Sequence, residues 1–203
     1  MNQPGIALLG LGPGDPDLIT RKAWDLLKNS SEVHLRTRQH PAVESFPNHL
    51  KVYSFDHFYE SENTFDEVYT HIVNSILNLG KRPQGVIYAV PGHPFIAEAT
   101  SVEIYRRAIK INLPIKIYEG LSFLESIHSA LRIDPLPKTV IIDSLELAVL
   151  HVPNFPPSIP AVIAQIYSRD VASEVKLTLM ENYPDEFPVK LIHAAGTAQV
   201  CVE

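Results

Sequence analysis

The chain has 203 residues, of which 45% are hydrophobic and 20% charged, and its formal net charge is −6 at pH 7. This length suits one large domain or two small ones, and the composition is that of a globular protein with a sizeable core. An acidic chain without a run of basic residues is unsuited to bind nucleic acid or an anionic membrane through its overall charge. We therefore expect neither among its partners.

Cysteine and histidine usage argues against disulfides and metal sites. Cys201 is the single cysteine, so the chain can form neither an internal disulfide nor a cysteine-based zinc site. The nine histidines show no i, i+4 pair with a glutamate, and we predict no metal site. The start, "MNQPGIALLG", lacks the features of a signal peptide, and no apolar run is long enough to span a bilayer. We predict a cytoplasmic protein.

Strands and helices alternate through the first two thirds of the chain. The segment 57–67 between the third strand and the second helix, "HFYESENTFDE", is predicted to be a solvated loop. Capping boxes open two of the helices, at Thr64 with Glu67 and at Ser122 with Glu125. Short apolar or β-branched runs predict strands over 5–10, 32–37, 51–55, 85–90 and 115–120, and helical periodicity predicts helices over 19–31, 63–81, 97–111 and 122–132.

This alternation favours a mainly parallel sheet covered by helices. Such sheets bind ligands where the carboxyl ends of the strands lead into loops. Three loops of this kind are candidates for a binding site: Gly10–Asp17, Pro91–Pro94 and Gly120–Phe123.

The second half of the chain reads as a smaller α/β domain. The segment "DPLPK", residues 134–138, has the composition of a linker, and we predict an N-terminal domain over 1–133 and a C-terminal domain over 134–203. Within the second domain we expect strands over 139–143, 161–167 and 189–196 and a helix over 170–183. Because the chain stops soon after a strand, we expect this domain to be incomplete.

The first loop, "GLGPGD", differs from the dinucleotide fingerprint G-x-G-x-x-G. Asp15 occupies the place of the third glycine, and Pro13 removes a backbone N–H that could hold a phosphate. A stiff, glycine-flanked turn with an acidic residue suits a flat or cationic ligand better than pyrophosphate. The alternative is a tight strand-to-helix turn in which Asp15 or Asp17 only complements the helix dipole.

The other two loops also have purely structural explanations. The second, "VPGHPF", can be a rigid turn with an exposed His93, and in the third Ser122 can act only as a helix N-cap. A ligand role for these loops follows from their expected position on the same sheet edge as the first loop.

Taken together, the loops resemble the tetrapyrrole (corrin/porphyrin) methylase family. The stretch "LLGLGPGDPDLIT" is similar to the opening signature of that family, "YAVPGHP" to its second ligand loop and "EGLSF" to its third, in the same order and spacing. The resemblance covers nearly the whole chain.

One branch is closer still: the methylase-like half of bacterial proteins that are fused to a MazG-type nucleoside triphosphate pyrophosphohydrolase. The segments that resemble it are "LRTRQHPAVE", "YAVPGHPFIAEAT", "SFLESIHSALRIDPL" and "VASEVKLTLMENYPDEFPV". The resemblance implies a fused MazG-type domain in the full-length protein, whose paired acidic motifs this chain lacks.

The family resemblance also implies two α/β domains with a ligand cleft between them, S-adenosylmethionine as cofactor, a small-molecule substrate and a homodimer. The positions that match the family's cofactor-binding loops are Pro13, Gly92, His93, Ile96, Ser122, Phe123, Ile166, Tyr167, Ala195 and Gly196.

One residue departs from the family pattern. Most members carry Gly-Asp-Pro where this chain has Gly92-His93-Pro94, so the negative charge that would face a cationic cofactor is missing. Two main hypotheses follow: an S-adenosylmethionine-dependent methyltransferase, and a non-catalytic sensor that binds S-adenosylmethionine or a related nucleotide for the fused hydrolase. The missing acidic motifs argue against a third hypothesis, that the chain is a nucleotide hydrolase in its own right. Asp15, His93 and Tyr88 are general-base candidates by position only.

Overall fold

The computed structural model describes residues 4–203. Contacts divide the chain into two units. Unit 1 comprises the described residues up to Leu131 together with Ile192–Glu203, and unit 2 comprises Arg132–Leu191. No helix among the described residues is both long and apolar enough to cross a bilayer.

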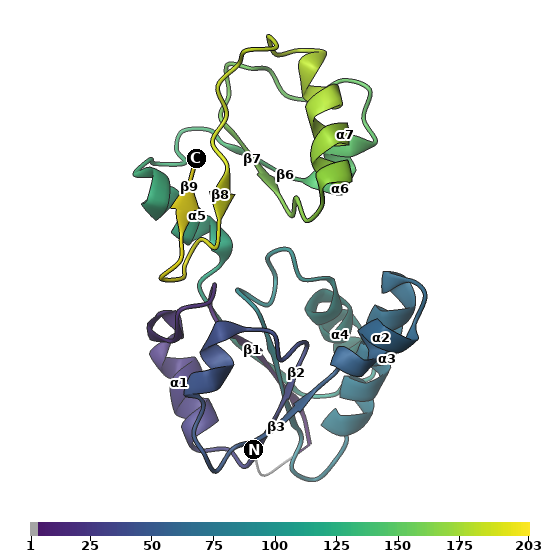
Figure 1. Ribbon diagram of the computed structural model, residues 1–203. Coiled ribbons are helices and arrows are strands. Elements are labelled where there is room, and N and C mark those ends of the chain that lie inside the picture. Colours follow the sequence, from purple (N-terminus) through teal and green to yellow (C-terminus); the bar gives the residue numbers. More distant parts are fainter. Residues whose placement is uncertain (1–3) are drawn as a thin grey trace. The chain divides into compact units, whose positions relative to one another are not determined.

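Unit 1 is built on a five-stranded sheet in which every pairing is parallel (Figure 1). The strand order is β3-β2-β4-β1-β5, so β1 lies in the sheet between β4 and β5. The predicted parallel sheet is therefore confirmed. The strands are β1 (Ile6–Gly10), β2 (Glu32–Leu35), β3 (Lys51–Ser54), β4 (Val86–Val90) and β5 (Ile115–Tyr118).

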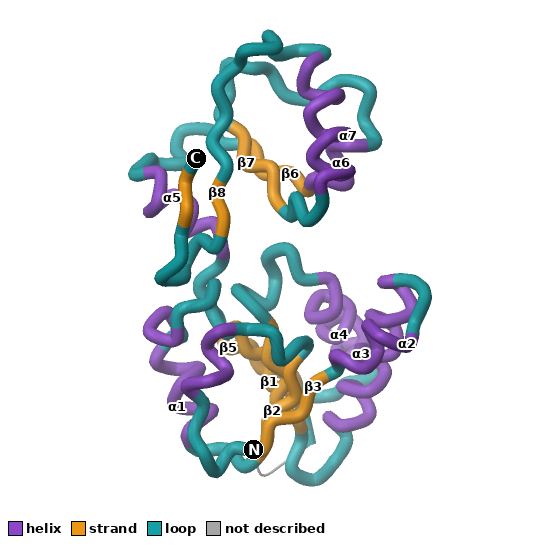
Figure 2. The backbone as a smooth tube through the Cα atoms, in the orientation of Figure 1, coloured by secondary structure: helices purple, strands orange, loops and turns teal. Residues whose placement is uncertain are grey.

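Helices cover both faces of this sheet (Figure 2). On β1, Ile6 and Leu8 face one hydrophobic core with α3 (Phe65–Gly80) and α4 (Ala99–Lys110), while Ala7 and Leu9 face a second core with α1 (Arg21–Lys28). Because side chains alternate along a strand, a run such as "IALLG" that is buried at every position requires cover on both faces. The helices of unit 1 are α1 (Arg21–Lys28), α2 (Asp56–Ser61), α3 (Phe65–Gly80), α4 (Ala99–Lys110) and α5 (Phe123–Leu131), with short 3₁₀ turns at Pro16–Leu18 and Pro41–Ser45.

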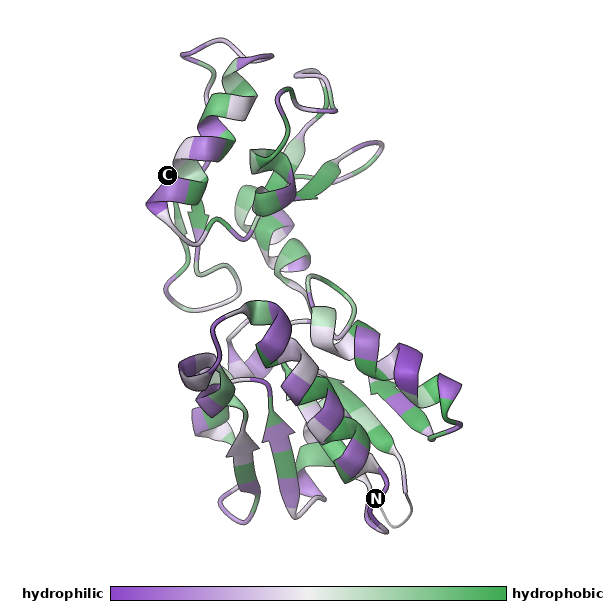
Figure 3. Cartoon of the chain, turned by 90° about the vertical axis from the view of Figure 1, so that its right-hand side faces the viewer, coloured by the Kyte–Doolittle hydropathy of each residue, from purple (hydrophilic) through white to green (hydrophobic). Residues whose placement is uncertain are grey.

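Hydropathy along the helices follows these contacts, with apolar and polar residues on different sides (Figure 3). The capping box of Thr64 and Glu67 at the start of α3 is present, as predicted. Phe65, the first residue of this helix, has a side chain that is 61% exposed. The last residue of the helix is Gly80. A larger residue would not fit there without a shift, because a Cβ would lie 2.6 Å from Cγ1 of Ile6.

Unit 2 is smaller and contains a two-stranded parallel sheet. Two helices, α6 (Ser144–Ala148) and α7 (Arg169–Met180), pack with β6 (Val140–Asp143) and β7 (Ala161–Ala164) around a core centred on Leu147, Phe155 and Val175.

Three elements differ from the sequence predictions. Most of α2 falls within the segment 57–67 that was expected to be a solvated loop, and α6 was not foreseen. The strand expected over 189–196 is reduced to β8 (Ile192–His193), which pairs antiparallel with β9 (Cys201–Val202). Contacts place this pair in unit 1, whereas the sequence led us to expect it in the second domain. The pair belongs with unit 1 because its turn contacts the loop after β1, where Asp15 N donates to the Gly196 carbonyl.

Candidate functional site

Three glycines bring the three predicted loops together at the carboxyl edge of the sheet. A Cβ on Gly10 would lie 2.4 Å from the Gly92 carbonyl oxygen and 2.6 Å from the Gly120 nitrogen. A Cβ on Gly120 would lie 2.3 Å from the same oxygen. Because these neighbours are backbone atoms that cannot swing aside, only glycine fits at either position. The loops after β1, β4 and β5 therefore touch through their main chains.

The first and second loops are joined by a pair of backbone hydrogen bonds. Gly92 N donates to the Gly12 carbonyl over 2.7 Å, and Gly12 N donates to the Gly92 carbonyl over 3.2 Å. Both glycines have positive φ, at 77° and 68°, which side chains disfavour. Gly92 is also next to the third loop, since Ser122 Cα lies 4.0 Å from the position that a Cβ on Gly92 would take.

His40 supports the first loop from the β2 side. Its Nε2 lies 3.1 Å from the Gly12 carbonyl oxygen, so Nε2 is the donor. The side chain is buried, and burial lowers the pKa of His40, which keeps the ring neutral near pH 7. His40 is also among the residues that line a surface depression of about 490 Å³, together with Arg38, Gln39, Pro41, Val43 and Glu44.

The turn between β8 and β9 packs on the first loop. Asp15 N donates to the Gly196 carbonyl over 2.8 Å, and a Cβ on Gly196 would lie 2.3 Å from Cγ of Pro13. Gly196 has a φ of 82°. The structure thus brings Pro13 together with Ala195 and Gly196, although about 180 residues separate them in the sequence.

The second loop is a compact turn held by its histidine. Phe95 N donates to His93 Nδ1 over 3.0 Å, so the neutral ring carries its proton on Nε2. Ile96 N donates to the His93 carbonyl over 3.2 Å. His93 and Ile96 are both partly exposed and follow Gly92 directly at the sheet edge.

The third loop is fixed by the predicted capping box. The Ser122 hydroxyl accepts from Leu124 N over 3.1 Å, and both the Ser122 hydroxyl and its backbone N–H donate to the Glu125 carboxylate. Partial burial acts to raise the pKa of Glu125, but these hydrogen bonds outweigh it and the pKa lies below its ordinary value. Glu125 is therefore ionised at pH 7. Phe123, the first residue of α5, is half-buried.

Two carboxylates of the third-loop region, Glu119 and Glu125, lie close enough to His93 to interact with it electrostatically. Its positive form would favour ionisation of both Glu119 and Glu125. The pKa of Glu119 is lowered first by its own backbone N–H and then by Lys22, whose ammonium lies 3.2 Å from the carboxylate. Glu119 is therefore paired with a cation, and the negative charge that the third loop adds to this edge is that of Glu125.

Two of the general-base candidates have structural tasks. The Tyr88 hydroxyl is fully buried and 2.8 Å from Thr100 Oγ1, and burial raises its pKa well above the ordinary range. Because Tyr88 points into the core with α3 and α4, its candidacy as a base is wrong. The Asp15 carboxylate accepts from Asp17 N over 2.9 Å and caps the short helix that follows, as its structural alternative predicted.

Ile166 and Tyr167 belong to unit 2 and follow β7. Their side chains are 41% and 64% exposed. Their assignment to the cofactor site stays a prediction.

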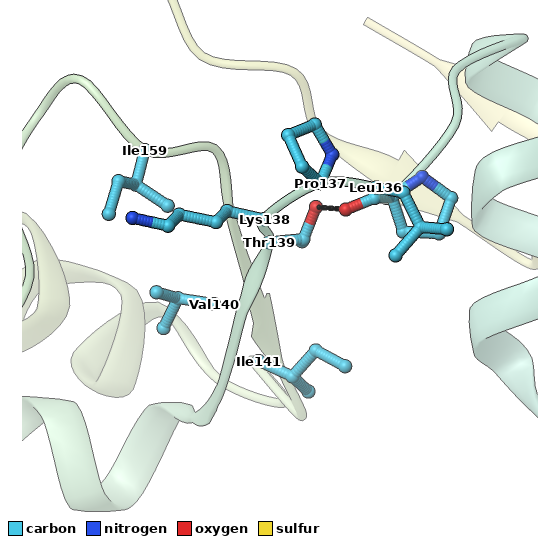
Figure 4. Close-up of a pocket in the computed structure, with 8 residues that line it drawn as sticks. Leu136, Pro137, Lys138, Thr139, Val140, Ile141 and Ile159 are labelled. Atoms are coloured by element: carbon cyan, nitrogen blue, oxygen red, sulfur yellow. Dashed lines mark hydrogen bonds between the residues drawn. The ribbon is translucent and has the colours of Figure 1, made fainter.

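A second surface depression, in unit 2, is unrelated to the loops. It measures about 470 Å³ and lies between the 135–141 segment and Ile159 (Figure 4). Thr139 Oγ1 donates to the Pro135 carbonyl over 2.8 Å, and Lys138 is the charged residue of the lining. With a single charged side chain among its eight lining residues, this depression shows no cluster of charged groups. No group of three metal-ligating side chains occurs within residues 4–203.

The chain is similar in sequence to a longer bacterial protein. The chain is 36% identical over 198 residues to the uncharacterized protein YabN of Bacillus subtilis, and this match covers 95% of the chain but 39% of YabN. The chain thus spans less than half the length of this curated relative.

Solved structures show the same fold at low sequence identity. Uroporphyrin-III-C-methyltransferase from Thermus thermophilus matches with a TM-score of 0.68 and 17% identity, over 98% of this chain and 81% of that one. The cobalt precorrin-4 methyltransferase CbiF matches with a TM-score of 0.67 and 17% identity, over 98% and 84%. Diphthine synthase matches with a TM-score of 0.62 and 14% identity, over 98% and 80%.

A family model decides the assignment, because it covers almost the entire chain. The match runs over residues 5–202 and takes in both units and all three loops. The chain belongs to the tetrapyrrole (corrin/porphyrin) methylase family.

Proposed function

We propose that the protein is an S-adenosylmethionine-dependent methyltransferase that acts on a small molecule. The observation that carries this proposal is the convergence of Gly10, Gly92 and Gly120, which lets three loop backbones meet at one sheet edge. Ligands of parallel α/β sheets bind at such edges. The family to which the chain belongs supports the methyl-transfer chemistry.

The residues at this edge suit a cationic cofactor. The glycines let the three loop backbones pack against one another, and the ionised Glu125 adds a negative charge to the edge, whereas Glu119 is paired with Lys22. S-adenosylmethionine supplies an already activated methyl group when it is bound. The protein then has to orient donor and acceptor and exclude water. Pro13, His93, Ile96, Ser122 and Phe123 are the side chains of unit 1 that we assign to cofactor binding, with the Ala195–Gly196 turn beside Pro13.

A second candidate function is a sensor domain that binds S-adenosylmethionine without transferring its methyl group. Two observations favour it: His93 replaces the acidic residue of most family members, and the matching region is a minor part of the longer YabN. In this reading the domain reports cofactor levels to a MazG-type pyrophosphohydrolase on the same polypeptide. That fusion is supported by the four segments, such as "LRTRQHPAVE", that resemble the MazG-fused branch of the family.

Binding and turnover of the cofactor separate the two functions. We would titrate the protein calorimetrically with S-adenosylmethionine and S-adenosylhomocysteine, and follow transfer of a labelled methyl group into a cell-derived pool of small molecules. A methyltransferase binds both compounds and labels an acceptor. A sensor binds them and labels none, which would contradict our first proposal.

A further inference from the structure

A polar cluster lies at the carboxyl end of β2, on the sheet face covered by α3 and α4. It consists of Arg36 after β2, Glu98 at the N-cap of α4, Tyr59 on α2 and Tyr69 on α3, and we call it the Arg36 cluster. Its charged members come from "LRTRQHPAVE" and "YAVPGHPFIAEAT", two segments that the cofactor assignment leaves only partly explained.

The acidic side of the cluster is closed and satisfied. Glu98 Oε2 accepts from Arg36 Nη1, and Glu98 Oε1 accepts from the backbone of Thr100 over 3.0 Å and of Ser101 over 3.3 Å. The Glu98 side chain is 2% exposed, whereas that of Arg36 is 25% exposed. A solute that approaches from solvent therefore meets the positive partner of the pair.

The recognition edge of Arg36 is unused. Among residues 4–203, Nη1 is the only guanidinium nitrogen of Arg36 with a hydrogen-bond partner, and Nε is buried without one. The N–H groups of Nε and Nη2 form the planar fork that grips a carboxylate or phosphate through two parallel bonds. The Tyr59 hydroxyl is also buried without a partner in the described part of the chain. Buried polar groups rarely stay unpaired, so both donors call for an acceptor oxygen.

The electrostatics keep these groups in their donor forms. Burial raises the pKa of Tyr59 and of Tyr69, and the nearby Arg36 charge opposes that rise in part. Burial opposes the charge on Arg36, but Glu98 outweighs it and the pKa of the guanidinium lies above its ordinary value. At neutral pH the cluster thus offers a cation and neutral phenols.

Arg82, in the turn between α3 and β4, shows what an arginine with a purely structural task looks like in the same unit. Its Nε donates to the Leu79 carbonyl over 3.2 Å, and its Nη2 donates to the Gly85 carbonyl over 3.1 Å and to the Glu32 carboxylate. The Nε and Nη2 donors of Arg82 are bonded within the protein, whereas those of Arg36 have no hydrogen-bond partner among the described residues.

We propose that the Arg36 cluster binds an oxyanion group of a small molecule, a carboxylate or a phosphate, through the Nε–Nη2 fork of Arg36 and the Tyr59 hydroxyl. The cluster lies at the carboxyl end of a parallel strand, as ligand sites of such sheets do. This inference does not depend on S-adenosylmethionine binding.

The test titrates the whole chain with inorganic phosphate and, separately, with acetate, at constant ionic strength set with chloride. The readout is the ¹H–¹⁵N signal of Arg36 Nε, identified by its loss in Arg36→Lys. We expect a saturable shift, and the ion that saturates it at the lower concentration tells phosphate recognition from carboxylate recognition. Absence of a saturable shift with both ions would overturn the proposal.

Variants locate the site. Tyr59→Phe keeps the Arg36–Glu98 pair intact and should weaken binding several-fold, and Arg36→Lys, followed by calorimetry, should weaken it roughly tenfold or more because the fork is lost. Tyr53→Phe, on the exposed side of β3, is the matched control and should bind like the wild type. If Arg36→Lys does not fold, Tyr59→Phe decides alone: unchanged affinity in that variant refutes the proposed site.

Discussion

At the residue scale, His93 occupies the place of the aspartate in the family motif that the second loop resembles, and substitutions there test whether charge matters. We predict that His93→Asp binds S-adenosylmethionine more tightly, because a carboxylate near a sulfonium in a partly shielded site contributes on the order of 1 kcal/mol. This corresponds to roughly a several-fold gain in affinity. An aspartate can also accept the Phe95 N–H as the histidine does. Calorimetric titration at two salt concentrations measures the gain, which should shrink as salt rises.

His93→Asn is the matched control, because it keeps a hydrogen-bond acceptor without the charge. It should bind the cofactor like the wild type. An equal gain in both variants would show that charge is not the cause.

The glycine contacts give a prediction for stability. Gly120→Ala places a Cβ 2.3 Å from the Gly92 carbonyl oxygen, and the backbone must shift to admit it. We expect a loss of about 1–3 kcal/mol in the free energy of unfolding, measured by urea denaturation. Leu121→Ala, at an exposed neighbouring side chain, is the control and should change stability little. Similar losses in both variants would contradict the proposed close contact.

At the element scale, the N-terminus of α5 predicts a pH-dependent stability. The pKa of Glu125 in the folded protein lies below 4.5, so its stabilising effect is present above that pH and is lost as pH falls through the folded pKa. Ser122→Ala removes the partner and should cost about 1 kcal/mol at pH 7. Denaturation at pH 7 and pH 3 should show a smaller difference between wild type and variant at pH 3. An equal or larger difference at pH 3 would refute the role of the Glu125 charge.

The elements also show how far sequence patterns reach. The run "VIYAV" predicted β4 because burial on both faces demands continuous apolar residues, and the Thr64 and Ser122 capping boxes located two helix starts. The helix α2 was missed, because its single short turn carries charged residues and is held by packing against α3. The extent of β8 was overestimated, because an apolar run does not reveal whether a partner strand is present.

The sequence predicted which loops meet at the sheet edge, but not the side chains that support them from elsewhere in the chain. Strand–helix order is enough to place Gly10, Gly92 and Gly120 on one edge, and a family pattern points to Pro13 and Gly196. The roles of His40 and Arg36 depend on long-range contacts with Gly12 and Glu98, which no local pattern encodes.

At the scale of the whole molecule, we predict a homodimer. Large apolar side chains of unit 2 remain exposed, among them Ile141, Val149 and Leu177 at 53%, 77% and 60%. Exposed apolar surface of this kind is typical of interaction sites. Light scattering at micromolar concentration should give twice the mass of one chain. The mass of a single chain over the same concentration range would contradict the prediction.

The central claim is that the three-loop edge of unit 1 binds S-adenosylmethionine, and calorimetric titration of the wild-type protein tests it most directly. We predict saturable binding with one site per chain, displaced by S-adenosylhomocysteine and weakened in His93→Trp, whose bulky side chain would fill the space at the second loop. Absence of saturable binding by either compound, or an unchanged affinity in His93→Trp, would contradict the claim.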